Sequence, residues 1–469
     1  MLAGLELFER HFAVAVGIEF FEPILGFGGV FLTARAGLEF IKAEGSVVVF
    51  VDRLESFFRA ETRLLGRFRR RGSRGGGGGR RCGGCRRGGC GFVGGVIIDN
   101  EAYFIDTRTI LVDNSLETLQ ELAKFHRHYL KLPIIALTGS NGKTTTKELI
   151  NVILSKKYKT KATLGNLNNH IGVPLTLLSF SKETEIGIVE MGANHQKEIE
   201  FLCDIAQPDY GYVTNFGKAH LEGFGGVQGV IKGKSELYHY ITDNKKAVFV
   251  NLEDAIQEEK TRLLTRFTFS QKEHSATVFI NKVTANPFVT IQTLGTEIKS
   301  HLIGLYNANN INAAITIGNH FGVPIQDIKE AIESYIPDNN RSQMAVKGSN
   351  EIILDAYNAN PSSMVVALEN FIQLDKPNKV IIIGDMFELG VESLQEHKVI
   401  VDMLSNQTTI QCHFVGKYFY ANAMVKSNFH FYTSFDDFIK FLEDTPFENQ
   451  ILLIKGSRGM ALERTLDYI

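Results

Sequence analysis

A lysine and a threonine behind a glycine-rich loop are the residues of this 469-residue chain best suited to chemistry. They belong to the run Ile134-Ile-Ala-Leu-Thr-Gly-Ser-Asn-Gly-Lys-Thr-Thr146. Loop amides can surround a polyphosphate, Lys143 adds a positive charge, and the Thr144 hydroxyl can hold Mg²⁺. The pattern is a variant of the usual phosphate-binding loop, because Leu137 stands where its first glycine is expected. The alternative is an ordinary turn between a strand and a helix.

Three further groups that could join this loop come after later strands. Glu190 ends the apolar run 186–190, and a carboxylate there would lie at the ligand edge of a parallel sheet, within reach of a Mg²⁺ shared with Thr144. His220 follows the run 210–214, and Lys234 comes fourteen residues later. Each has a plain alternative when taken singly: a solvated glutamate at a strand end, a surface histidine, and a solvated lysine on a helix.

The elements that must position these residues form two α/β sets. The first set has predicted strands at 134–137, 186–190, 210–214 and 247–251, separated by helical patterns and followed by a helix at 307–321. This order predicts a mostly parallel, doubly wound sheet. The second set has predicted strands at 352–355, 380–384, 410–415, 430–432 and 451–455. Five strands with helices between them indicate a smaller Rossmann-like unit. Upstream, short strands at 96–98 and 109–112 precede a helix at 115–130, which Asn114 or Ser115 can cap.

Composition excludes several classes of protein. The net charge of −2 gives no basic excess for nucleic acid, and 44% hydrophobic residues fit a soluble globular chain. The apolar run 23–34 is too short to span a membrane, and Glu6, Glu9 and Arg10 stand where a signal peptide would be apolar. Five cysteines suggest no disulfide framework. We therefore expect a cytoplasmic protein that binds neither membrane nor nucleic acid, and a monomer.

Residues 1–95 use a different set of amino acids from the rest of the chain. They contain no Asn, Gln or Tyr and one lysine, Lys42, and residues 67–91 are almost entirely Arg, Gly and Cys. The segment could be a basic arm for nucleic acid, or a metal site at Cys82, Cys85 and Cys90, which lacks the fourth ligand of structural zinc. The abrupt change favours a third interpretation, a shifted reading frame or a wrongly assigned start. We expect no packed core between Arg67 and Gly91.

Taken together, the motifs from the phosphate loop onward resemble the Mur ligase family, the ATP-dependent amide-forming enzymes of peptidoglycan synthesis. The resemblance covers about residues 96–469 and rests on several motifs in order. They are Thr138-Gly-Ser-Asn-Gly-Lys-Thr-Thr, Gly165-Asn-Leu-Asn-Asn-His-Ile-Gly-Val-Pro174, Glu190-Met-Gly, Asn215 to His220-Leu-Glu-Gly-Phe, Lys234, Asn307-Ala-Asn-Asn310, Asp355-Ala-Tyr-Asn-Ala-Asn-Pro361, Gly384-Asp-Met-Phe-Glu-Leu-Gly390 with His397, and Lys455-Gly-Ser-Arg-Gly459. One departure is Tyr306, where the family usually has histidine.

The resemblance implies an activity, its cofactors and the residues that serve them. It implies the addition of D-alanyl-D-alanine to UDP-MurNAc-tripeptide through an acyl phosphate, with ATP and two Mg²⁺ ions. The implied catalytic residues are Lys143, His220, Lys234 and Arg341, and the implied metal ligands are Thr144, Glu190, His220 and a carbamylated Lys234. The implied ATP-binding residues are Gly139, Ser140, Asn141, Gly142, Lys143, Thr144, Thr145, Asn307, Asn310 and Asp355. The implied substrate residues are Asn166, Asn168, Asn169, Asn358, Asn360, Asp385, Glu388, Lys455, Ser457 and Arg458.

The resemblance fails over the first part of the chain. The family's Ser/Thr-x-Asp-Ser/Thr-Arg signature for the UDP-sugar is missing from residues 1–95. We therefore predict an anomalous segment at 1–95, a remnant of the UDP-sugar-binding domain at 96–131, a central ATP-binding domain at 132–337 and a C-terminal ligase domain at 338–469. Two other functions stay open: another amide ligase of the superfamily, similar to folylpolyglutamate synthase, and a nucleotide-binding remnant without catalysis.

Overall fold

The computed structural model describes four strands within residues 12–51 and then residues 95–104, 109–338 and 340–469. The chain divides into two compact units, residues 1–129 and residues 130–469. Within the described residues, no helix is both long and apolar enough to cross a lipid bilayer.

The first unit is built on a six-stranded sheet in the order β2-β3-β4-β1-β5-β6. Its strands are β1 (Phe12–Val16), β2 (Val30–Ala34), β3 (Leu38–Ala43), β4 (Ser46–Val51), β5 (Gly95–Ile98) and β6 (Thr109–Leu111), and its helices are η3 (Glu101–Tyr103) and α2 (Ser115–Leu130). Helix α2 has the predicted bounds. The Asn114 side chain caps it by accepting hydrogen bonds from the amides of Leu116, at 2.9 Å, and Glu117, at 3.1 Å.

This sheet crosses the boundary that the sequence predicts near residue 96. Strand β1 pairs with β4 on one side and with β5 on the other, so strands from both sides of residue 96 share one ladder. No strand was predicted before Val96, because the unusual composition hid the local pattern; strand pairing uses backbone groups that every non-proline residue carries. The stretch 67–91 lies outside the described residues, and the binding properties of the unit stay a prediction.

The second unit begins with the central domain, which extends to helix α11. Its strands are β7 (Ile134–Thr138), β8 (Thr160–Ala162), β9 (Ile186–Glu190), β10 (Tyr210–Val213), β11 (Ala247–Asn251), β12 (Thr265–Ser270), β13 (Val278–Ala285), β14 (Phe288–Thr293) and β15 (Thr296–Ile303). Its helices are α3 (Lys143–Leu154), α4 (Gly172–Leu178), α5 (Glu198–Ala206), α6 (Leu221–Phe224), α7 (Val227–Lys234), α8 (Glu236–Asp243), α9 (Ala255–Thr261), α10 (Asn307–His320) and α11 (Ile325–Ser334).

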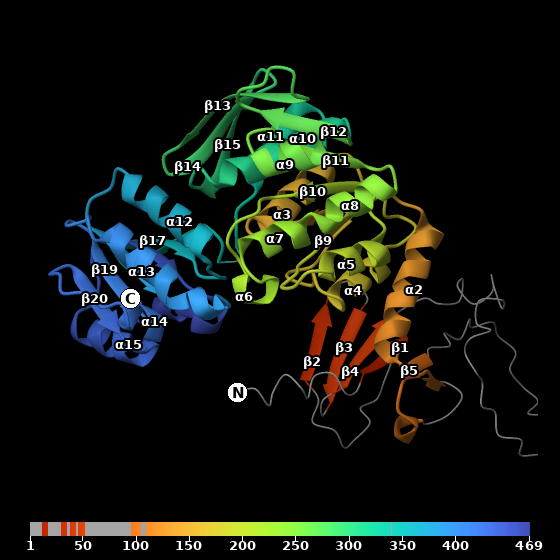
Figure 1. Ribbon diagram of the computed structural model, residues 1–469, viewed down its shortest axis with the longest axis horizontal. Coiled ribbons are helices and arrows are strands. Elements are labelled where there is room, and N and C mark those ends of the chain that lie inside the picture. Colours follow the sequence, from red (N-terminus) through yellow and green to blue (C-terminus); the bar gives the residue numbers. More distant parts are fainter. Residues whose placement is uncertain are drawn as a thin grey trace, which may run out of the picture. The chain divides into compact units, whose positions relative to one another are not determined.

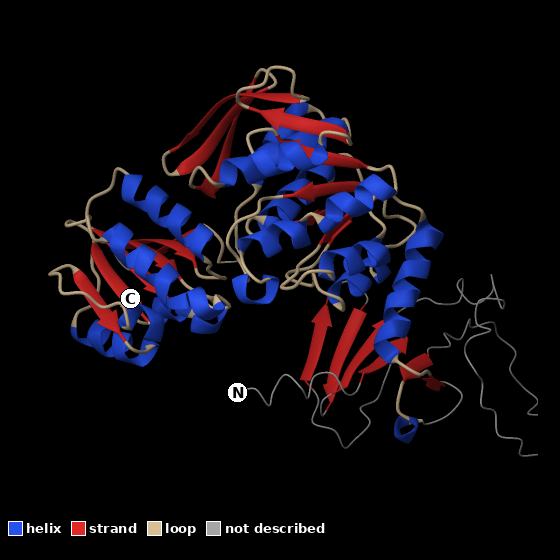
Figure 2. Ribbon diagram, in the orientation of Figure 1, coloured by secondary structure: helices blue, strands red, loops and turns tan. Residues whose placement is uncertain are grey.

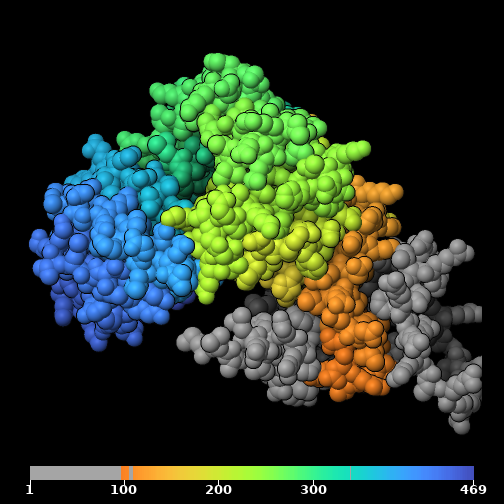
Figure 3. Space-filling model, viewed as in Figure 1, coloured from red at the N-terminus to blue at the C-terminus, as the bar shows by residue number. Residues whose placement is uncertain are grey.

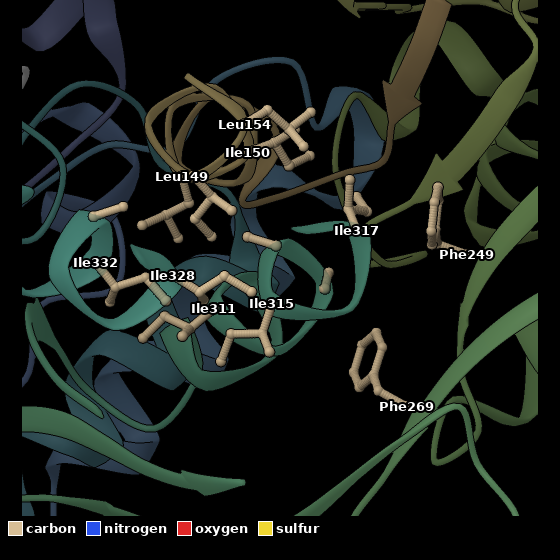
Figure 4. Close-up of a cluster of buried hydrophobic side chains, with 14 of the residues drawn as sticks. Leu149, Ile150, Leu154, Phe249, Phe269, Ile311, Ile315, Ile317, Ile328 and Ile332 are labelled. Carbon is tan, nitrogen blue, oxygen red and sulfur yellow. The ribbon is translucent and has the colours of Figure 1, made fainter. Parts of the chain in front are cut away.

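These strands form one nine-stranded sheet in the order β15-β14-β13-β12-β11-β10-β7-β9-β8. The strands from β8 to β13 pair in parallel, whereas β13, β14 and β15 form an antiparallel meander at one edge (Figure 1). Strand β7 is buried at every position, as a central parallel strand covered on both faces must be. Helices α3, α10 and α11 pack their Leu and Ile side chains together over the sheet (Figure 4).

The C-terminal domain completes the second unit with a separate six-stranded sheet in the order β16-β17-β21-β18-β19-β20. Its strands are β16 (Gln343–Lys347), β17 (Asn350–Asp355), β18 (Lys379–Gly384), β19 (Gln411–Val415), β20 (Phe429–Tyr432) and β21 (Ile451–Lys455). Its helices are α12 (Pro361–Gln373), η4 (Gly390–Glu392), α13 (Ser393–Leu404), α14 (Lys417–Tyr420), α15 (Phe435–Asp444), η5 (Arg458–Met460) and η6 (Leu462–Asp467). The sheet is parallel except for β16, an edge strand that the sequence did not predict. Figure 2 shows the strands of this domain in red with blue helices around them.

The doubly wound central sheet and the second α/β domain confirm the fold class predicted for residues 132–469. The predicted strands 186–190, 247–251 and 451–455 have the observed bounds, and the others differ by one or two residues. The meander β13–β15 was not predicted.

Candidate functional site

The glycine-rich loop lies between β7 and α3 with the geometry that a phosphate site needs. Gly139 and Gly142 both have positive φ angles, 138° and 79°. A Cβ at Gly139 would collide with the Thr214 side chain, and one at Gly142 would collide with the amide of Asn310. The loop therefore requires glycine at both positions. Amides of the first turn of α3 have no partner within the helix, so they are available to an anion.

Residues that follow β10 hold the phosphate loop in place through hydrogen bonds. The amides of Ser140 and Asn141 donate to the main-chain and side-chain oxygens of Asn215, both at 3.1 Å. The Thr214 hydroxyl donates to the carbonyl of Asn141 at 2.5 Å, and the Ser140 hydroxyl donates to the carbonyl of Gly217 at 2.6 Å. The loop is thus held in shape before any ligand arrives, which lowers the entropic cost of binding.

Lys143 is folded back over its own loop. Its ammonium donates to the carbonyls of Gly139, at 2.6 Å, and Ser140, at 3.2 Å. Burial lowers the pKa of Lys143 to about 8; the nearby Glu190 carboxylate opposes this shift, and the Arg341 guanidinium adds to it. The side chain therefore remains mostly protonated at neutral pH. Its ammonium can leave the two carbonyls and bind a phosphate instead.

Glu190 lies where the sequence predicts it, at the end of β9 and beside the loop. The residue is 1% exposed. Its Oε1 accepts hydrogen bonds from the Thr144 hydroxyl at 3.3 Å and from the Asn168 amide at 2.8 Å, whereas its Oε2 is buried with no partner. A buried carboxylate oxygen without a partner is costly, so it marks a place for a cation or a donor.

These donors suit Mg²⁺ bound together with a nucleotide. Mg²⁺ is usually held by one or two protein carboxylates together with substrate phosphates, rather than by a closed cage of protein ligands. In the part of the chain that the structure describes, no three His, Cys, Asp or Glu side chains converge on one point. One carboxylate and one hydroxyl, with phosphate oxygens to complete the shell, therefore fit the arrangement at Glu190 and Thr144.

His220 and Lys218 connect the central domain to the C-terminal domain. The His220 imidazole contacts the carboxylate of Glu388 through Nδ1, which leaves Nε2 on the other side of the ring, and this hydrogen bond holds the pKa of Glu388 below its usual value. Lys218 donates to Glu396 at 2.6 Å, and its amide donates to the Ser362 hydroxyl at 2.7 Å. Figure 3 shows yellow-green surface of the central domain meeting the blue surface of the C-terminal domain.

Lys234 ends α7 and is 1% exposed. Its Nζ donates to the carbonyl of Ala193 at 3.0 Å and lies 4.9 Å from the centre of the Phe224 ring. Burial lowers the pKa of this amine well below its ordinary value, and the charge of Lys143 lowers it further. The two lysines predicted to be functional therefore influence each other electrostatically.

The amides predicted for the adenine side form a chain that begins at the phosphate loop. The Thr146 hydroxyl donates to Asn310 at 3.1 Å, and Asn310 donates to Asn307 at 2.8 Å. Asn307 reaches Ser342 in the C-terminal domain at 3.3 Å, and the Tyr306 hydroxyl pairs with the same serine at 2.6 Å. Tyr306 thus fills the position of the usual histidine and adds a contact between the domains.

Asp355 and Arg341 lie at the edge of the C-terminal sheet. Asp355 accepts from the ammonium of Lys455 at 2.6 Å and from the Ser342 amide at 3.2 Å. The Arg341 guanidinium lies 3.7 Å from the centre of the Tyr357 ring, and its Nε is buried with no partner. The guanidinium is thus stacked on an aromatic ring and retains an unused donor, as an anion-binding arginine would.

Several of the predicted substrate residues of the C-terminal domain lie together: the Arg458 amide donates to the Asn358 side chain at 3.3 Å, the Lys455 ammonium donates to the Asn358 carbonyl at 3.2 Å, and the Ser457 amide donates to the Asp385 carbonyl at 3.2 Å. Asn360 caps α12 and pairs with Asn141 of the phosphate loop, Nδ2 to Oδ1 at 2.7 Å. The Asn169 side chain accepts from the amides of Ile171 and Gly172 at the start of α4, and Asp385 is buried and accepts from the amides of Tyr418 and Phe419. Asn166 and Asn358 are exposed, Ser457 is buried beneath the amide of Phe387, and Arg458 pairs with Glu463. Their role towards a substrate stays a prediction.

Sequence reasoning missed two features of the site. The first is Lys147, which is completely buried one turn after Lys143. The second is the set of contacts between domains, because Asn141 and Asn360 are 219 residues apart and no spacing rule links them. A lysine at the interval of one helical turn was the only available signal for Lys147.

A nucleotide-type phosphate loop with a buried carboxylate beside it, contacted by a second α/β domain, defines an ATP-dependent ligase of two catalytic domains. The chain belongs to the Mur ligase family. Residues 137–318 match the Mur ligase middle domain, and residues 340–458 match the Mur ligase, glutamate ligase domain.

Individual members of this family are similar to the chain over most of their own length. The UDP-N-acetylmuramoyl-tripeptide--D-alanyl-D-alanine ligase of Bacillus subtilis (strain 168) is 31% identical over 365 residues, which are 76% of this chain and 79% of that protein. The crystal structure of MurF from Acinetobacter baumannii is similar with a TM-score of 0.70 and 31% identity, over 78% of this chain and 82% of that one. The crystal structure of MurF from Thermotoga maritima in complex with ADP is similar with a TM-score of 0.69 and 25% identity, over 79% of this chain and 87% of that one.

Proposed function

We propose that this chain is the ATP-dependent ligase that adds D-alanyl-D-alanine to UDP-MurNAc-tripeptide in peptidoglycan synthesis. The observation that carries the proposal is the contact of the second domain with a preformed phosphate loop, Asn360 on Asn141, beside the partnerless Oε2 of Glu190. Ligases similar to this chain over three quarters of its length carry that activity in their names. The reaction uses ATP, which is supplied in the cytoplasm, so we propose a cytoplasmic enzyme. One copy of the chain contains both domains of the site, so a monomer suffices for the reaction.

The reaction proceeds in two displacements. An oxygen of the tripeptide carboxylate attacks the γ-phosphorus of ATP, the bond to the β-phosphate oxygen breaks, and ADP leaves. The amine of D-alanyl-D-alanine then attacks the acyl carbonyl carbon, loses a proton, and inorganic phosphate leaves. Both steps pass through concentrated negative charge, so catalysis consists mainly of placing positive groups and donors around it.

The residues on the central domain divide this task. Lys143 moves from its loop carbonyls onto the γ-phosphate, and the loop amides hold the β-phosphate. Thr144 and Glu190 would hold one Mg²⁺ and His220 with Lys234 would hold a second, and these ions would supply positive charge beside the transferred phosphate. Burial lowers the pKa of the Lys234 amine, which favours its capture of CO₂ as a carbamate, and a carbamate oxygen is a cation ligand that an ammonium could never be.

The C-terminal domain supplies the remaining groups. Arg341 reaches the γ-phosphate with its free Nε, and Asp355 accepts hydrogen bonds from the ribose. Asn307 and Asn310 face the adenine from the central domain. The substrate residues of the loop 165–169 and of the segments 358–360, 385–388 and 455–458 complete the site when the domains close on each other.

The direct test is a reaction with all three substrates. Purified chain, ATP, Mg²⁺, UDP-MurNAc-tripeptide and D-alanyl-D-alanine should release ADP and phosphate and give a product with the mass of the pentapeptide nucleotide. Omitting either acceptor or donor should abolish the product. Formation of product with L-glutamate and a folate instead would support the folylpolyglutamate synthase-like alternative. Tight ATP binding without any product would support the non-catalytic one.

A further inference from the structure

Lys147 is an unexplained charge in the interior of the central domain. It lies on α3 one turn after Lys143, and its side chain is 0% exposed. Its ammonium has three partners: the carbonyl of Thr163 at 2.6 Å, the carbonyl of Gly165 at 3.4 Å, and the carboxylate of Glu148 at 2.8 Å. A buried ammonium costs several kcal/mol unless its charge and N–H groups are paired, and here two carbonyls and one carboxylate surround it.

The carbonyls that Lys147 holds begin the loop 163–169, which leads from β8 to α4. The loop returns to Glu190 in two ways. The Thr163 hydroxyl accepts a hydrogen bond from the Glu190 amide at 2.9 Å, and the Asn168 side chain donates to Oε1 of Glu190 at 2.8 Å. The carbonyl of Asn168 also accepts from the amide of Gly192 at 2.7 Å. The loop therefore fixes both the backbone and the carboxylate of Glu190.

These contacts fix the orientation of the Glu190 carboxylate. Oε1 is engaged by Asn168 and Thr144, and Oε2 is buried and bare. If the loop moved, Asn168 would leave Oε1, and the carboxylate could rotate and share its oxygens differently with Thr144. Partners behind a metal ligand commonly set its orientation, and their loss typically costs ten- to a hundredfold in metal affinity.

We propose that Lys147 and Asn168 are positioning residues that act through the loop 163–169 to present Oε2 of Glu190 to the divalent cation of the nucleotide. The inference rests on the proposed function, because it requires a cation–nucleotide complex at the phosphate loop. It gives Asn168 a task in the cation site in addition to the substrate contact predicted from sequence.

The experiment measures cation affinity rather than turnover. Mn²⁺ is titrated into full-length protein saturated with a non-hydrolysable ATP analogue, and binding is followed by electron paramagnetic resonance. Asn168→Ala and Lys147→Met should each weaken Mn²⁺ binding about tenfold or more. Asn151→Ala and Lys156→Met are the matched controls: Asn151 pairs with Thr160 and Lys156 pairs with Glu330, both away from Glu190. The controls should bind Mn²⁺ like the wild type.

Hydrogen exchange separates positioning from general destabilisation. In Lys147→Met the amides of 163–169 should exchange about tenfold faster or more, while amides of β7 and β10 keep their wild-type rates. Faster exchange throughout the domain would show a structural role and overturn the proposal for Lys147. If Lys147→Met does not fold, Asn168→Ala decides, since it removes no buried charge.

The outcomes distinguish this inference from the function on which it rests. Wild-type Mn²⁺ affinity in a folded Asn168→Ala variant would overturn the positioning role and leave the ligase proposal intact. A wild-type chain that bound no Mn²⁺ with the analogue would overturn both.

Discussion

At the scale of single residues, the site is governed by two lysines whose surroundings lower their pKa values to different extents. Lys143 keeps two carbonyl partners and a pKa of about 8, so it is a cation at neutral pH. Lys234 is more deeply buried, has one carbonyl partner, and has its pKa lowered much further. Burial thus lowers the pKa of both amines but lowers that of Lys234 further, and the proposed chemistry uses this difference.

The charge of Lys143 leads to the first prediction. Lys143→Ala should lower ATP hydrolysis in the full reaction about a hundredfold or more, because the γ-phosphate loses its cation. The affinity of the wild type for ATP should also fall as the pH rises above 8, where the free enzyme loses this proton. Lys156→Ala is the control just beyond the end of the same helix, and coupled release of phosphate is the measurement. Unchanged turnover in Lys143→Ala would show that the loop does not hold the transferred phosphate.

The lowered pKa of the buried Lys234 amine leads to the second prediction. Lys234→Ala should lose activity, and bicarbonate or a short carboxylate such as acetate should restore part of it by supplying the missing oxygen ligand. Wild-type protein in ¹³C-labelled bicarbonate should show a carbamate signal by NMR that the variant lacks. Full activity of Lys234→Ala, or a plain amine in a metal-bound crystal, would contradict carbamylation.

At the scale of elements, the sequence predicted those strands and loops whose residues form a clear local pattern. Strands 186–190 and 247–251 are apolar and buried on both faces, and periodicity identifies such strands. The meander strands alternate between buried and exposed positions and contain charged residues, as in Lys282 of β13, so they lack a continuous apolar run. Glycine and lysine spacing located the phosphate loop. It could not locate the pairing of Asn141 with Asn360 or of His220 with Glu388, which depends on how two domains meet.

A histidine between two strands of the C-terminal domain leads to the third prediction. His413 of β19 is stacked on His430 of β20 and surrounded by aromatic rings, and burial lowers its pKa to about 3. The unfolded chain binds this proton near pH 6.5 and the folded chain does not, so stability is complete above pH 6.5 and is lost as the pH falls towards 3. The slope contributed by this residue is at most about 1.4 kcal/mol per pH unit.

Urea unfolding at several pH values is the measurement for this histidine. His413→Phe should reduce the loss of unfolding free energy between pH 6.5 and 4, because no proton can then be taken up at this position. The exposed His239 of α8 provides the control, since His239→Phe should leave the pH profile as it is. A His413→Phe profile parallel to the wild type would show that other groups cause the acid sensitivity.

At the scale of the whole molecule, the chain joins two domains that match the Mur ligase family to an unusual first unit. The matches to the family models begin at residue 137. Before it, β1 to β4 pair into one sheet with β5 and β6, so the first segment contributes ordered backbone pairing. Sheet pairing, however, does not by itself recognise a nucleotide sugar, which needs specific side chains at a site.

The last prediction concerns that recognition. Titrated by calorimetry, the purified chain should bind ATP yet bind UDP-MurNAc-tripeptide poorly, because the family's Ser/Thr-x-Asp-Ser/Thr-Arg signature is missing from residues 1–95 and the run 67–91 is almost entirely Arg, Gly and Cys. A chimera with a family-type domain ahead of Val96 should recover both binding and ligation to D-alanyl-D-alanine. This result would show that residues 96–469 can catalyse the ligation. Micromolar binding by the unaltered chain would mean that residues 1–95 form a divergent but working substrate domain. The sheet that spans residue 96 would then be its scaffold, and the interpretation as a shifted reading frame would be wrong.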